Sequence, residues 1–300
     1  MFIIKHKNFF VSLSALFVVV SITLISVFKL HMGIDFRGGA QLDVAYTNTR
    51  PSVDIVRESI SKLNLGEAII QPSGENDYFI KTRDLSEVER KSLVDALSAN
   101  DTTATEKSFT SIGPSVGREL ARKSIISIIL ISLGIILFIA YAFRKVSKPV
   151  ASWKYGLIAV GTLLHDIMIP VGIFAVLSRV YGVEVDTLFV VALLTVLGLS
   201  VSDTIVVFDR IRENIRSKAF ATFEETVGRS IEQTYTRSIT TSLTVIIVLI
   251  ALFLFGPTST KVFSLMMASG MFFGTYSSIF LASPLLVLWS GVKEGDSKKK

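Results

Sequence analysis

The chain has 300 residues, of which 50% are hydrophobic, and its mean hydropathy is +0.57. This composition is too apolar for an ordinary water-soluble domain of the same length, so we expect an integral membrane protein. The formal net charge is +6, but the Lys and Arg residues are not interleaved with aromatic residues as a nucleic-acid groove requires. We therefore expect no nucleic-acid partner. Cysteine is absent, so packing and not disulfide bonds must stabilise the fold.

Six apolar windows are long enough to cross a hydrocarbon core about 30 Å thick, which takes about 20 helical residues. We place these spans near residues 9–30, 124–143, 155–177, 187–208, 238–255 and 262–289. A hydrophilic block, residues 31–123, separates the first span from the second. The predicted organisation is an N-terminus with the first transmembrane helix (1–30), a hydrophilic domain (31–123), five further transmembrane helices (124–290) and a basic tail (291–300).

The basic residues gather in alternate connections between the spans. Lys and Arg are frequent before the first span, in the second and fourth connections, and after the last span. The short connections at 178–186 and 256–261 contain only one basic residue each, Arg179 and Lys261. The positive-inside rule therefore predicts that both termini are cytoplasmic and that the hydrophilic block is extracytoplasmic.

The hydrophilic block has the pattern of a small α+β domain. Its residues predict strands at 41–46, 67–71, 78–82 and 102–111, a turn at 72–77, and helices at 51–63 and 86–97. Ser86 and Glu89 have the spacing of a capping box at the start of the second helix. The order βαββαβ predicts a ferredoxin-like fold with both helices on one face of the sheet.

The same block contains no motif that would indicate catalysis. It has no glycine-rich phosphate loop, no nucleophile elbow and no His or Cys residues at metal-ligand spacing. We therefore expect no enzyme activity, no metal and no cofactor. The domain is predicted to act as a binding or lever element, and the alternative is a plain spacer.

Two of the predicted spans carry acidic residues. His165 and Asp166 stand at the centre of the third span, and Asp203 lies about 22 Å along the fourth at 1.5 Å per residue. Ionised groups are costly inside a bilayer, so these residues must face the protein interior or a hydrated cavity. Asp203 is either a neutral packing carboxyl or a proton carrier. The His165–Asp166 pair is either a hydrogen bond that packs helices or part of the same function.

The fifth span supplies a candidate counter-charge. Arg237 stands near the predicted cytoplasmic entrance of this span, and hydroxyl residues continue inward from Ser238 to Thr244. Arg237 and Asp203 both fall in the cytoplasmic half of the bilayer, where they could pair across helices and each favour the charged form of the other. The hydroxyls could relay protons, although Ser and Thr in membrane helices often bond only their own backbone.

The last span carries small residues at every fourth position. Gly270, Gly274, Ser278 and Ala282 form a stripe suited to close helix packing. Either another helix of this chain or a partner protein could cover the stripe.

Four strings of residues resemble the SecD/SecF family, membrane subunits that assist bacterial Sec protein export. The first follows the first span and consists of Gly33, Ile34, Asp35, Phe36, Arg37, Gly38 and Gly39, and the second is IGPSVGREL at 112–120. The third is SDTIVVFDRIREN at 202–214, and the fourth is TYTRSITTS at 234–242. Ser202 replaces an Asn of the family pattern, and Ser238 replaces a Thr. The family also has a His-Asp pair in the third span.

The resemblance implies a multi-pass protein of the bacterial inner membrane that acts as an auxiliary subunit of the Sec translocase. It implies SecD, the SecYEG channel and other Sec accessory subunits as partners, and an unfolded polypeptide as the transported substrate. Protons and membrane lipid complete the expected partners. The resemblance also implies that the chain uses the proton-motive force, and we expect Asp203, Arg237, Asp166 and His165 to be the proton-coupling residues.

Two other classes of protein are compatible with acidic residues in membrane spans. An intramembrane aspartyl protease would use Asp166 and Asp203 as a dyad, which requires the two carboxylates to be in contact. Half of a proton-driven small-solute exporter would need a companion half, because this chain holds one set of six spans.

Overall fold

The computed structural model describes residues 1–47, 50–98, 103–142 and 150–290. The last residue of the predicted second span, the basic residues at 144–148, the first residue of the predicted fourth strand and the basic tail at 291–300 lie outside the described residues. The chain divides into two compact units. The helical unit comprises Met1–Leu30, Ser127–Val183 and Leu188–Lys300, and the sheet unit comprises His31–Ile126 and Glu184–Thr187.

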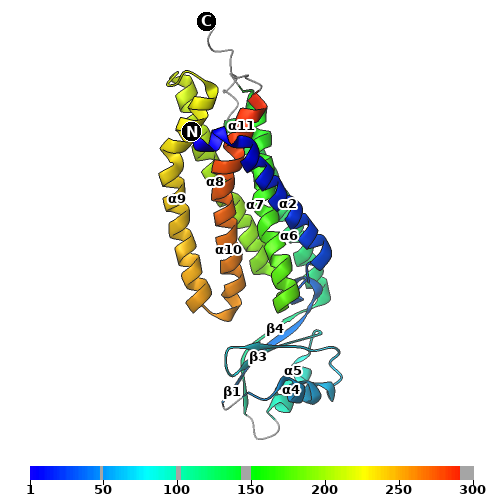
Figure 1. Ribbon diagram of the computed structural model, residues 1–300. Coiled ribbons are helices and arrows are strands. Elements are labelled where there is room, and N and C mark those ends of the chain that lie inside the picture. Colours follow the sequence, from blue (N-terminus) through cyan, green and yellow to red (C-terminus); the bar gives the residue numbers. More distant parts are fainter. Residues whose placement is uncertain (48–49, 99–102, 143–149, 291–300) are drawn as a thin grey trace. The chain divides into compact units, whose positions relative to one another are not determined.

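Six helical segments of the described chain are long and apolar enough to cross a membrane, as predicted. They are α2 (Lys7–Phe28), α6 (Pro114–Ala142), α7 (Ser152–Tyr181), α8 (Thr187–Arg216), α9 (Phe223–Phe255) and the continuous segment Thr258–Ser290 (Figure 1). The last of these consists of α10 (Thr258–Ser277), a π-helical turn η1 (Ser278–Ala282) and α11 (Ser283–Ser290). A short helix, α1 (Phe2–Lys5), precedes α2.

Several of the long helices extend beyond the windows predicted from hydropathy. α6 begins at Pro114, well before residue 124, and α9 begins at Phe223, well before residue 238, while α8 continues past residue 208 to Arg216. The extensions were not predicted because hydropathy detects only the apolar part of a helix. Polar interactions stabilise them. Arg210 pairs with Glu213 at 2.6 Å one turn away, and the hydroxyl of Thr222 caps α9 by accepting from the backbone N–H of Glu225 at 3.1 Å.

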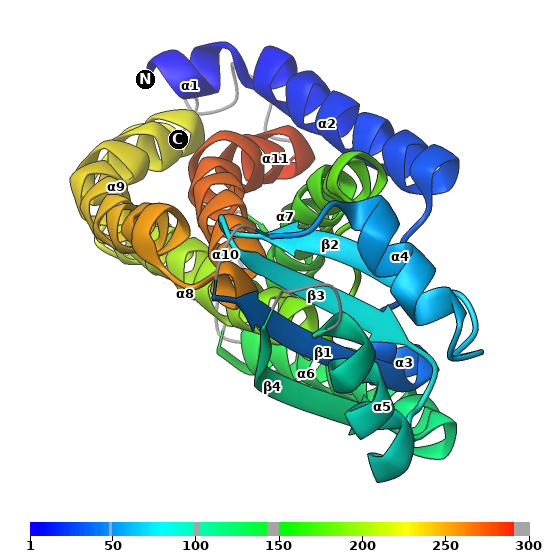
Figure 2. The ribbon, with the colours of Figure 1, turned by 90° about the horizontal axis from the view of Figure 1, so that it is seen from below.

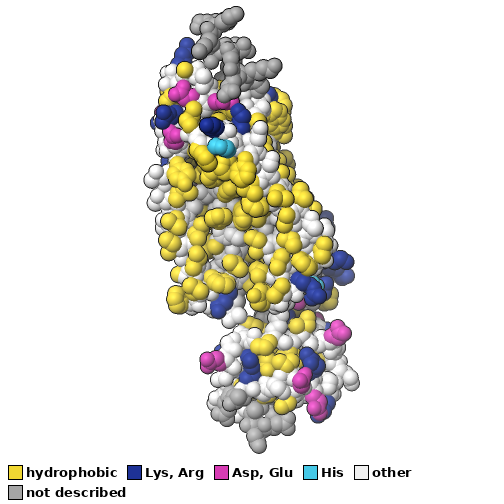
Figure 3. Space-filling view, viewed as in Figure 1, with side chains coloured by type: hydrophobic (Ala, Val, Ile, Leu, Met, Phe, Trp, Pro, Cys, Tyr) yellow, Lys and Arg dark blue, Asp and Glu magenta, His cyan; other side chains and the backbone are white. Residues whose placement is uncertain are grey.

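The six long segments differ in how much of their surface the chain itself covers. α7 and the α10–α11 segment are mostly buried and α8 is half buried, whereas α2, α6 and α9 leave most of their apolar surface exposed. The exposed side chains include Ile129, Leu133 and Leu137 on α6 and Leu243 and Ile247 on α9. Figure 3 shows hydrophobic side chains over the middle of the helical unit on the face in view. A hydrocarbon environment removes the cost of exposing such side chains.

The interior of the helical unit is packed from large apolar side chains. Tyr155 of α7 and Phe208 of α8 meet edge to face with ring centroids 5.3 Å apart, and both rings are buried. Ile158, Leu197 and Leu286 belong to the same cluster. This packing fixes how α7, α8 and α11 are rotated about their axes, and thereby where their polar residues point.

The sheet unit contains four antiparallel strands in the order β2-β3-β1-β4. These are β1 (Gly39–Tyr46), β2 (Ile69–Ser73), β3 (Asp77–Thr82) and β4 (Ala104–Ile112), with α4 (Val53–Ser61) after β1 and α5 (Glu87–Leu97) after β3. Figure 2 shows the strands side by side in this order. Leu42 of β1 is opposite Ile80 of β3 and Phe109 of β4, which aligns the apolar residues of neighbouring strands.

Apolar residues of α4 and α5 pack against the sheet. Val56 and Ile60 of α4 and Leu93 of α5 are buried together with Leu42 and Val44 of β1. The alternation of buried and half-buried residues along β1 and β3 agrees with a sheet that has one packed face.

One local prediction in this unit was wrong. Pro72 was placed in a turn but belongs to β2, which is possible because β2 is an edge strand and proline lacks only the backbone N–H that pairs strands. The segment 33–39 contains the single-turn helix α3 (Ile34–Arg37). The predicted capping box is present, with Ser86 accepting from the Glu89 N–H and Glu89 accepting from the Ser86 N–H at 2.9 Å.

The capping box generates a prediction about pH. A hydrogen bond from Arg83, reinforced by two from Ser86, lowers the pKa of the Glu89 carboxyl from 4.5 to about 2. Because the folded-state pKa is the lower one, this carboxylate stabilises α5 above about pH 4.5 and loses its effect as the pH falls towards 2. We expect Glu89→Gln to weaken α5 at neutral pH and to flatten this acid dependence.

Amide-exchange protection factors of α5 in the detergent-solubilised full chain measure the effect. Glu58→Gln is the matched control, because Glu58 makes only an exposed ion pair with Lys62 on α4. Equal acid dependence of α5 protection in the Glu89→Gln variant and the wild type would contradict the prediction.

Candidate functional site

Asp203 lies on α8 where this helix meets α9 and the π-turn. One carboxylate oxygen accepts a hydrogen bond from the Ser238 hydroxyl of α9 at 2.7 Å, and the other accepts from the Ser278 hydroxyl of η1 at 3.1 Å. Asp203 itself is half-buried. Three helical elements therefore converge on one ionisable group.

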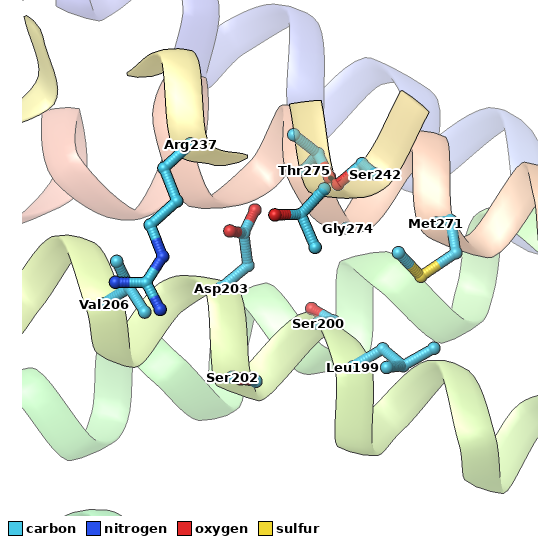
Figure 4. Close-up of a pocket in the computed structure, with 11 residues that line it drawn as sticks. Leu199, Ser200, Ser202, Asp203, Val206, Arg237, Ser242, Met271, Gly274 and Thr275 are labelled. Atoms are coloured by element: carbon cyan, nitrogen blue, oxygen red, sulfur yellow. Dashed lines mark hydrogen bonds between the residues drawn. The ribbon is translucent and has the colours of Figure 1, made fainter. Parts of the chain in front are cut away.

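A cavity of about 120 Å³, lined by both polar and apolar residues, opens beside this carboxylate. Figure 4 shows Asp203 of α8 and Arg237 of α9 among the side chains that line it, together with Ser242 of α9 and Thr275 of α10. The hydroxyls of Ser242 and Thr275 are hydrogen-bonded to each other. The volume is sufficient for several water molecules, and carboxylate, guanidinium and hydroxyl groups provide partners for them.

Arg237 does not pair with Asp203 in this structure. Within the described residues no ion pair involves the Arg237 guanidinium, which lies beside Val206 in Figure 4. The reason is helical geometry: successive residues of a helix are rotated by about 100°, so the hydroxyl of Ser238 takes the position opposite Asp203. The counter-charge predicted from the sequence is thus a neighbour of the carboxylate and not its partner.

A second cavity shares lining residues with the first. It has a volume of about 310 Å³ and shares two lining residues, Val206 and Arg237, with the cavity beside Asp203. Its other lining residues are polar or charged: Asp209, Arg210, Glu213, Gln233 and Thr234. Arg237 therefore borders both the cavity beside Asp203 and the cavity beside the charged residues at the end of α8.

A second carboxylate, Asp166 of α7, is fully buried in the helical unit. It accepts hydrogen bonds from His165 Nδ1 at 2.8 Å, from the Ser277 hydroxyl at 2.7 Å and from the Ser200 hydroxyl. The His165 ring stacks on Tyr276 with centroids 6.1 Å apart, and its Nε2 is buried without a hydrogen-bond partner among the described residues. Three donors thus satisfy this carboxylate, as a buried acidic group requires.

Consecutive serines of the last span serve the two carboxylates. Ser277, the last residue of α10, donates to Asp166, and Ser278, the first residue of η1, donates to Asp203. Ser200 and Asp203 are one turn apart on α8, so this helix also contributes to both groups. Across the described residues, no hydrogen bond joins the Asp166 carboxylate to the Asp203 carboxylate. This separation does not match the shared-proton dyad of an aspartyl protease.

The donor serines were mostly missed in the sequence. Ser200 and Ser277 were not singled out, and Ser278 was assigned only to the small-residue stripe. The available signal was weak: Ser200 precedes Asp203 by one helical turn, and two adjacent serines interrupt an apolar span. Because hydroxyls in membrane helices commonly bond their own backbone, sequence alone did not distinguish these serines from structural ones.

Gly270 and Gly274 lie where α10 contacts α8. A side chain at Gly270 would collide with Val196, and one at Gly274 would press on Ser200, which binds Asp166. This part of the stripe therefore faces another helix of the same chain. The close approach brings the serines of α10 and η1 within reach of the acidic groups.

The motif at 33–39 lies in the sheet unit and packs against the start of α6. Gly38 has a φ of +81°, which favours glycine, and a side chain there would come within 2.7 Å of the Pro114 backbone. A side chain at Gly117 would approach the backbone N of Gly38 to 2.8 Å. Phe36 is buried beside this contact. The two glycine-containing motifs at 33–39 and 112–120 are therefore two halves of one close backbone packing.

The described residues contain no cluster of three or more His, Asp or Glu side chains that could hold a metal ion. The chemistry available at the site is hydrogen bonding and proton exchange by two carboxyls, one imidazole and several hydroxyls, next to a cavity large enough for water. These features define a multi-pass membrane protein with ionisable groups enclosed among its helices.

The chain belongs to the SecD/SecF family of protein export membrane proteins. The model of the SecD/SecF C-terminal region matches residues 92–292, and the model of the SecD/SecF GG motif matches residues 23–49. The protein translocase subunit SecF of Thermobaculum terrenum is 42% identical over 299 residues, which cover 96% of this chain and 93% of that protein. SecF of Anaerolinea thermophila is 34% identical over 291 residues, with 96% and 93% coverage.

The structure is also similar to that of a longer protein. It matches the crystal structure of SecDF from Thermus thermophilus, a translocon-associated membrane protein, with a TM-score of 0.81 and 30% identity. The match covers 95% of this chain and 38% of that chain. The chain thus spans well under half the length of SecDF and nearly the whole length of SecF.

The contact between α10 and α8 generates a prediction about stability. Gly270→Ala should destabilise the protein by about 1–3 kcal/mol, because the added methyl group collides with the stiff side chain of Val196. Gly134→Ala on α6 is the matched control, because the structure has nothing within 4 Å of an added side chain there. Thermal denaturation in detergent measures both variants. A Gly270→Ala protein as stable as the Gly134→Ala protein would refute the proposed packing.

Proposed function

We propose that this protein is an auxiliary subunit of the Sec translocase that uses the proton-motive force to assist export of unfolded proteins. Family membership and the names of its relatives support the assignment to protein export. The observation that carries the proton coupling is the half-buried Asp203 carboxylate, which accepts hydrogen bonds from α9 and η1 and borders a cavity that Arg237 also lines. A carboxyl in such a place can take up and release a proton and also change the contacts between helices.

The hydrogen-bond chemistry of the carboxyl gives the mechanism. An ionised carboxylate only accepts hydrogen bonds, so it can hold the hydroxyls of Ser238 and Ser278 at once. A protonated carboxyl donates through one oxygen, so the serine that faces this oxygen has to turn its hydroxyl from donor to acceptor. Protonation also replaces charge-assisted hydrogen bonds with weaker neutral ones, and it therefore loosens the contacts of α8 with α9 and η1. One charge that moves through 100 mV supplies about 2.3 kcal/mol, which exceeds the net contribution of about 0.5–1.5 kcal/mol from an ordinary hydrogen bond.

Arg237 regulates access to the carboxyl in this proposal. In the present structure Asp203 is held by serines, and Arg237 borders both cavities. A shift of α9 that removes Ser238 from Asp203 would let the guanidinium approach the carboxylate and favour release of its proton. The second cavity would then carry the proton to the charged end of α8.

His165 and Asp166 support the site from α7. Asp166 accepts hydrogen bonds from Ser200 of α8 and Ser277 of α10. α8 also carries Asp203, and α10 leads directly into η1, whose Ser278 binds Asp203. We propose that this buried group stabilises one arrangement of α7, α8 and α10 and that His165 holds it in place. Its part in proton coupling is thereby one of positioning.

The orientation of the chain and its partners complete the proposal. Both termini are cytoplasmic, and the sheet unit forms a ferredoxin-like extracytoplasmic domain, as the positive-inside rule and the strand order β2-β3-β1-β4 favour. SecD is the companion, because the SecDF proteins contain a further region that this chain does not cover. The assembly acts on SecYEG and the exported polypeptide. We assign no enzyme activity to the chain.

Replacement of Asp203 tests this function. Asp203→Asn imitates the protonated carboxyl in shape and in its pattern of one donor and one acceptor, but it cannot exchange a proton. We expect the variant to assemble with SecD and SecYEG and to lose the gradient-dependent part of export, so that export falls to the level measured without a proton gradient. Export of a purified unfolded precursor into inverted membrane vesicles, with and without a gradient, is the measurement.

Asp54→Asn is the control, because it removes one charge at a side chain that is 90% exposed on α4. That variant should retain gradient-dependent export. Full gradient-dependent export by the Asp203→Asn protein would show that another group carries the proton.

A further inference from the structure

The four residues Glu184–Thr187, which connect α7 to α8, belong to the sheet unit. They lie alongside the segment that begins the sheet unit at His31. Val185 donates its backbone N–H to the His31 carbonyl at 2.7 Å, and Gly33 donates to the Val185 carbonyl at 2.8 Å. Met32 and Val185 thereby form a parallel β-bridge, and the Val185 side chain is buried. This connection is held against the segment at His31 by a single β-bridge.

An ion pair fastens the connection to the sheet itself. Lys81 of β3 contacts Glu184 at 2.8 Å, with side chains only 15% and 16% exposed. The other ion pair that β3 makes within the described residues, between Asp77 and Lys107, has its lysine 49% exposed. A pair shielded from water is weakened less by ions and solvent than an exposed one, and loss of one partner leaves the other charge uncompensated. Lys81–Glu184 is therefore suited to hold two segments together.

A third contact reaches the first residue of α8. The Asp35 carboxylate accepts a hydrogen bond from the backbone N–H of Thr187 at 2.8 Å. Such a carboxylate satisfies one of the unpaired N–H groups at a helix start, and its negative charge interacts favourably with the positive end of the helix dipole. Gly33 is required for the approach, because a side chain there would come within 2.9 Å of the Val185 carbonyl oxygen. We call the set His31–Asp35, Lys81 and Glu184–Thr187 the clip.

The clip is joined to the proposed proton site by one uninterrupted helix. α8 runs from Thr187 to Arg216 and carries Asp203. The distance along the helix axis from Thr187 to Asp203 is about 24 Å at 1.5 Å per residue. An α-helix without a proline or π-turn transmits axial and rotational displacement over such a length. The described residues of α8 contain neither interruption.

We propose that the clip is the coupling element through which displacement of α8 at Asp203 moves the sheet unit. The proposal rests on the function proposed above and adds the part that converts proton exchange into movement. Lys81, Glu184 and Asp35 are positioning residues in this device. They do not touch the proton site, and their effect is to make the sheet unit follow the start of α8.

A charge-reversal cycle on the Lys81–Glu184 pair tests the proposal. Lys81→Glu and Glu184→Lys each place like charges in contact and should open the clip, whereas the double variant restores opposite charges. We expect each single variant to reduce gradient-dependent export at least threefold and the double variant to recover most of it. Lys62→Glu, at a side chain that is 70% exposed directly after α4, is the matched control and should leave export unchanged.

Infrared titration of the Asp203 carboxyl in liposomes separates coupling from proton binding. The full chain is used, and the Asp203→Asn protein identifies the band. We expect the midpoint of this band to be the same in wild type and in both single variants, because the clip is remote from the carboxyl. Reduced export with an unchanged midpoint would show that Asp203 still binds protons but that proton binding no longer drives export.

Each other outcome overturns the inference. Single variants that export normally would show that the ion pair is not needed for coupling. A double variant that stays inactive would show that the residues act individually and not as a pair. A shifted Asp203 midpoint in the single variants would show that the clip acts on proton binding. Failure of the proposed function itself has a different signature, since wild-type Asp203 would then not titrate or Asp203→Asn would export normally.

Discussion

The structure of the helical unit depends on one constraint: a carboxyl group placed among apolar helices must be given hydrogen-bond donors. Asp166 and Asp203 obtain theirs from side chains on neighbouring helices, chiefly from serines. Serine has a short side chain, so the helix backbones must approach closely for its hydroxyl to reach. Gly270 provides that approach, and the π-turn after Ser277 lets two consecutive serines serve two different groups. Packing and chemistry therefore have a common origin in this unit.

The fold follows from the sequence where a single physical signal dominates. Hydropathy located all six long helices, because each apolar window is far longer than a buried strand. The helix ends were not predicted, since beyond the apolar window the helices are continued by local polar contacts such as Arg210–Glu213. In the sheet unit, alternation located the strands, and the capping box at Ser86 marked the start of α5. The edge position of β2, which permits Pro72, depends on strand order and so on tertiary structure.

The candidate site was predicted in its residue types and only partly in its contacts. Asp203 and Arg237 line one cavity, but adjacent Ser238 and not Arg237 binds the carboxylate. The difference is a rotation of α9 by one residue, which is fixed by packing around the whole helix and leaves no mark in a short motif. Asp166 and His165 were identified by the cost of placing them in a membrane span, whereas Ser200 and Ser277 carry no such cost and gave no signal. Ionisable residues in a membrane span can be recognised in a sequence because burying them is energetically unfavourable, whereas the serines that bind them cannot.

The docking of Glu184–Thr187 on the start of the sheet unit has a consequence for biosynthesis. Asp35 and Thr187 are separated by 152 residues along the chain. At an elongation rate of roughly 5–20 residues per second, the ribosome needs roughly 8–30 s to make the second after the first. The strands and helices of the sheet unit can pair during that interval, but the segment at His31 has to wait for α7 to be inserted. The sheet unit can therefore be completed only after α2, α6 and α7 have been synthesised and inserted.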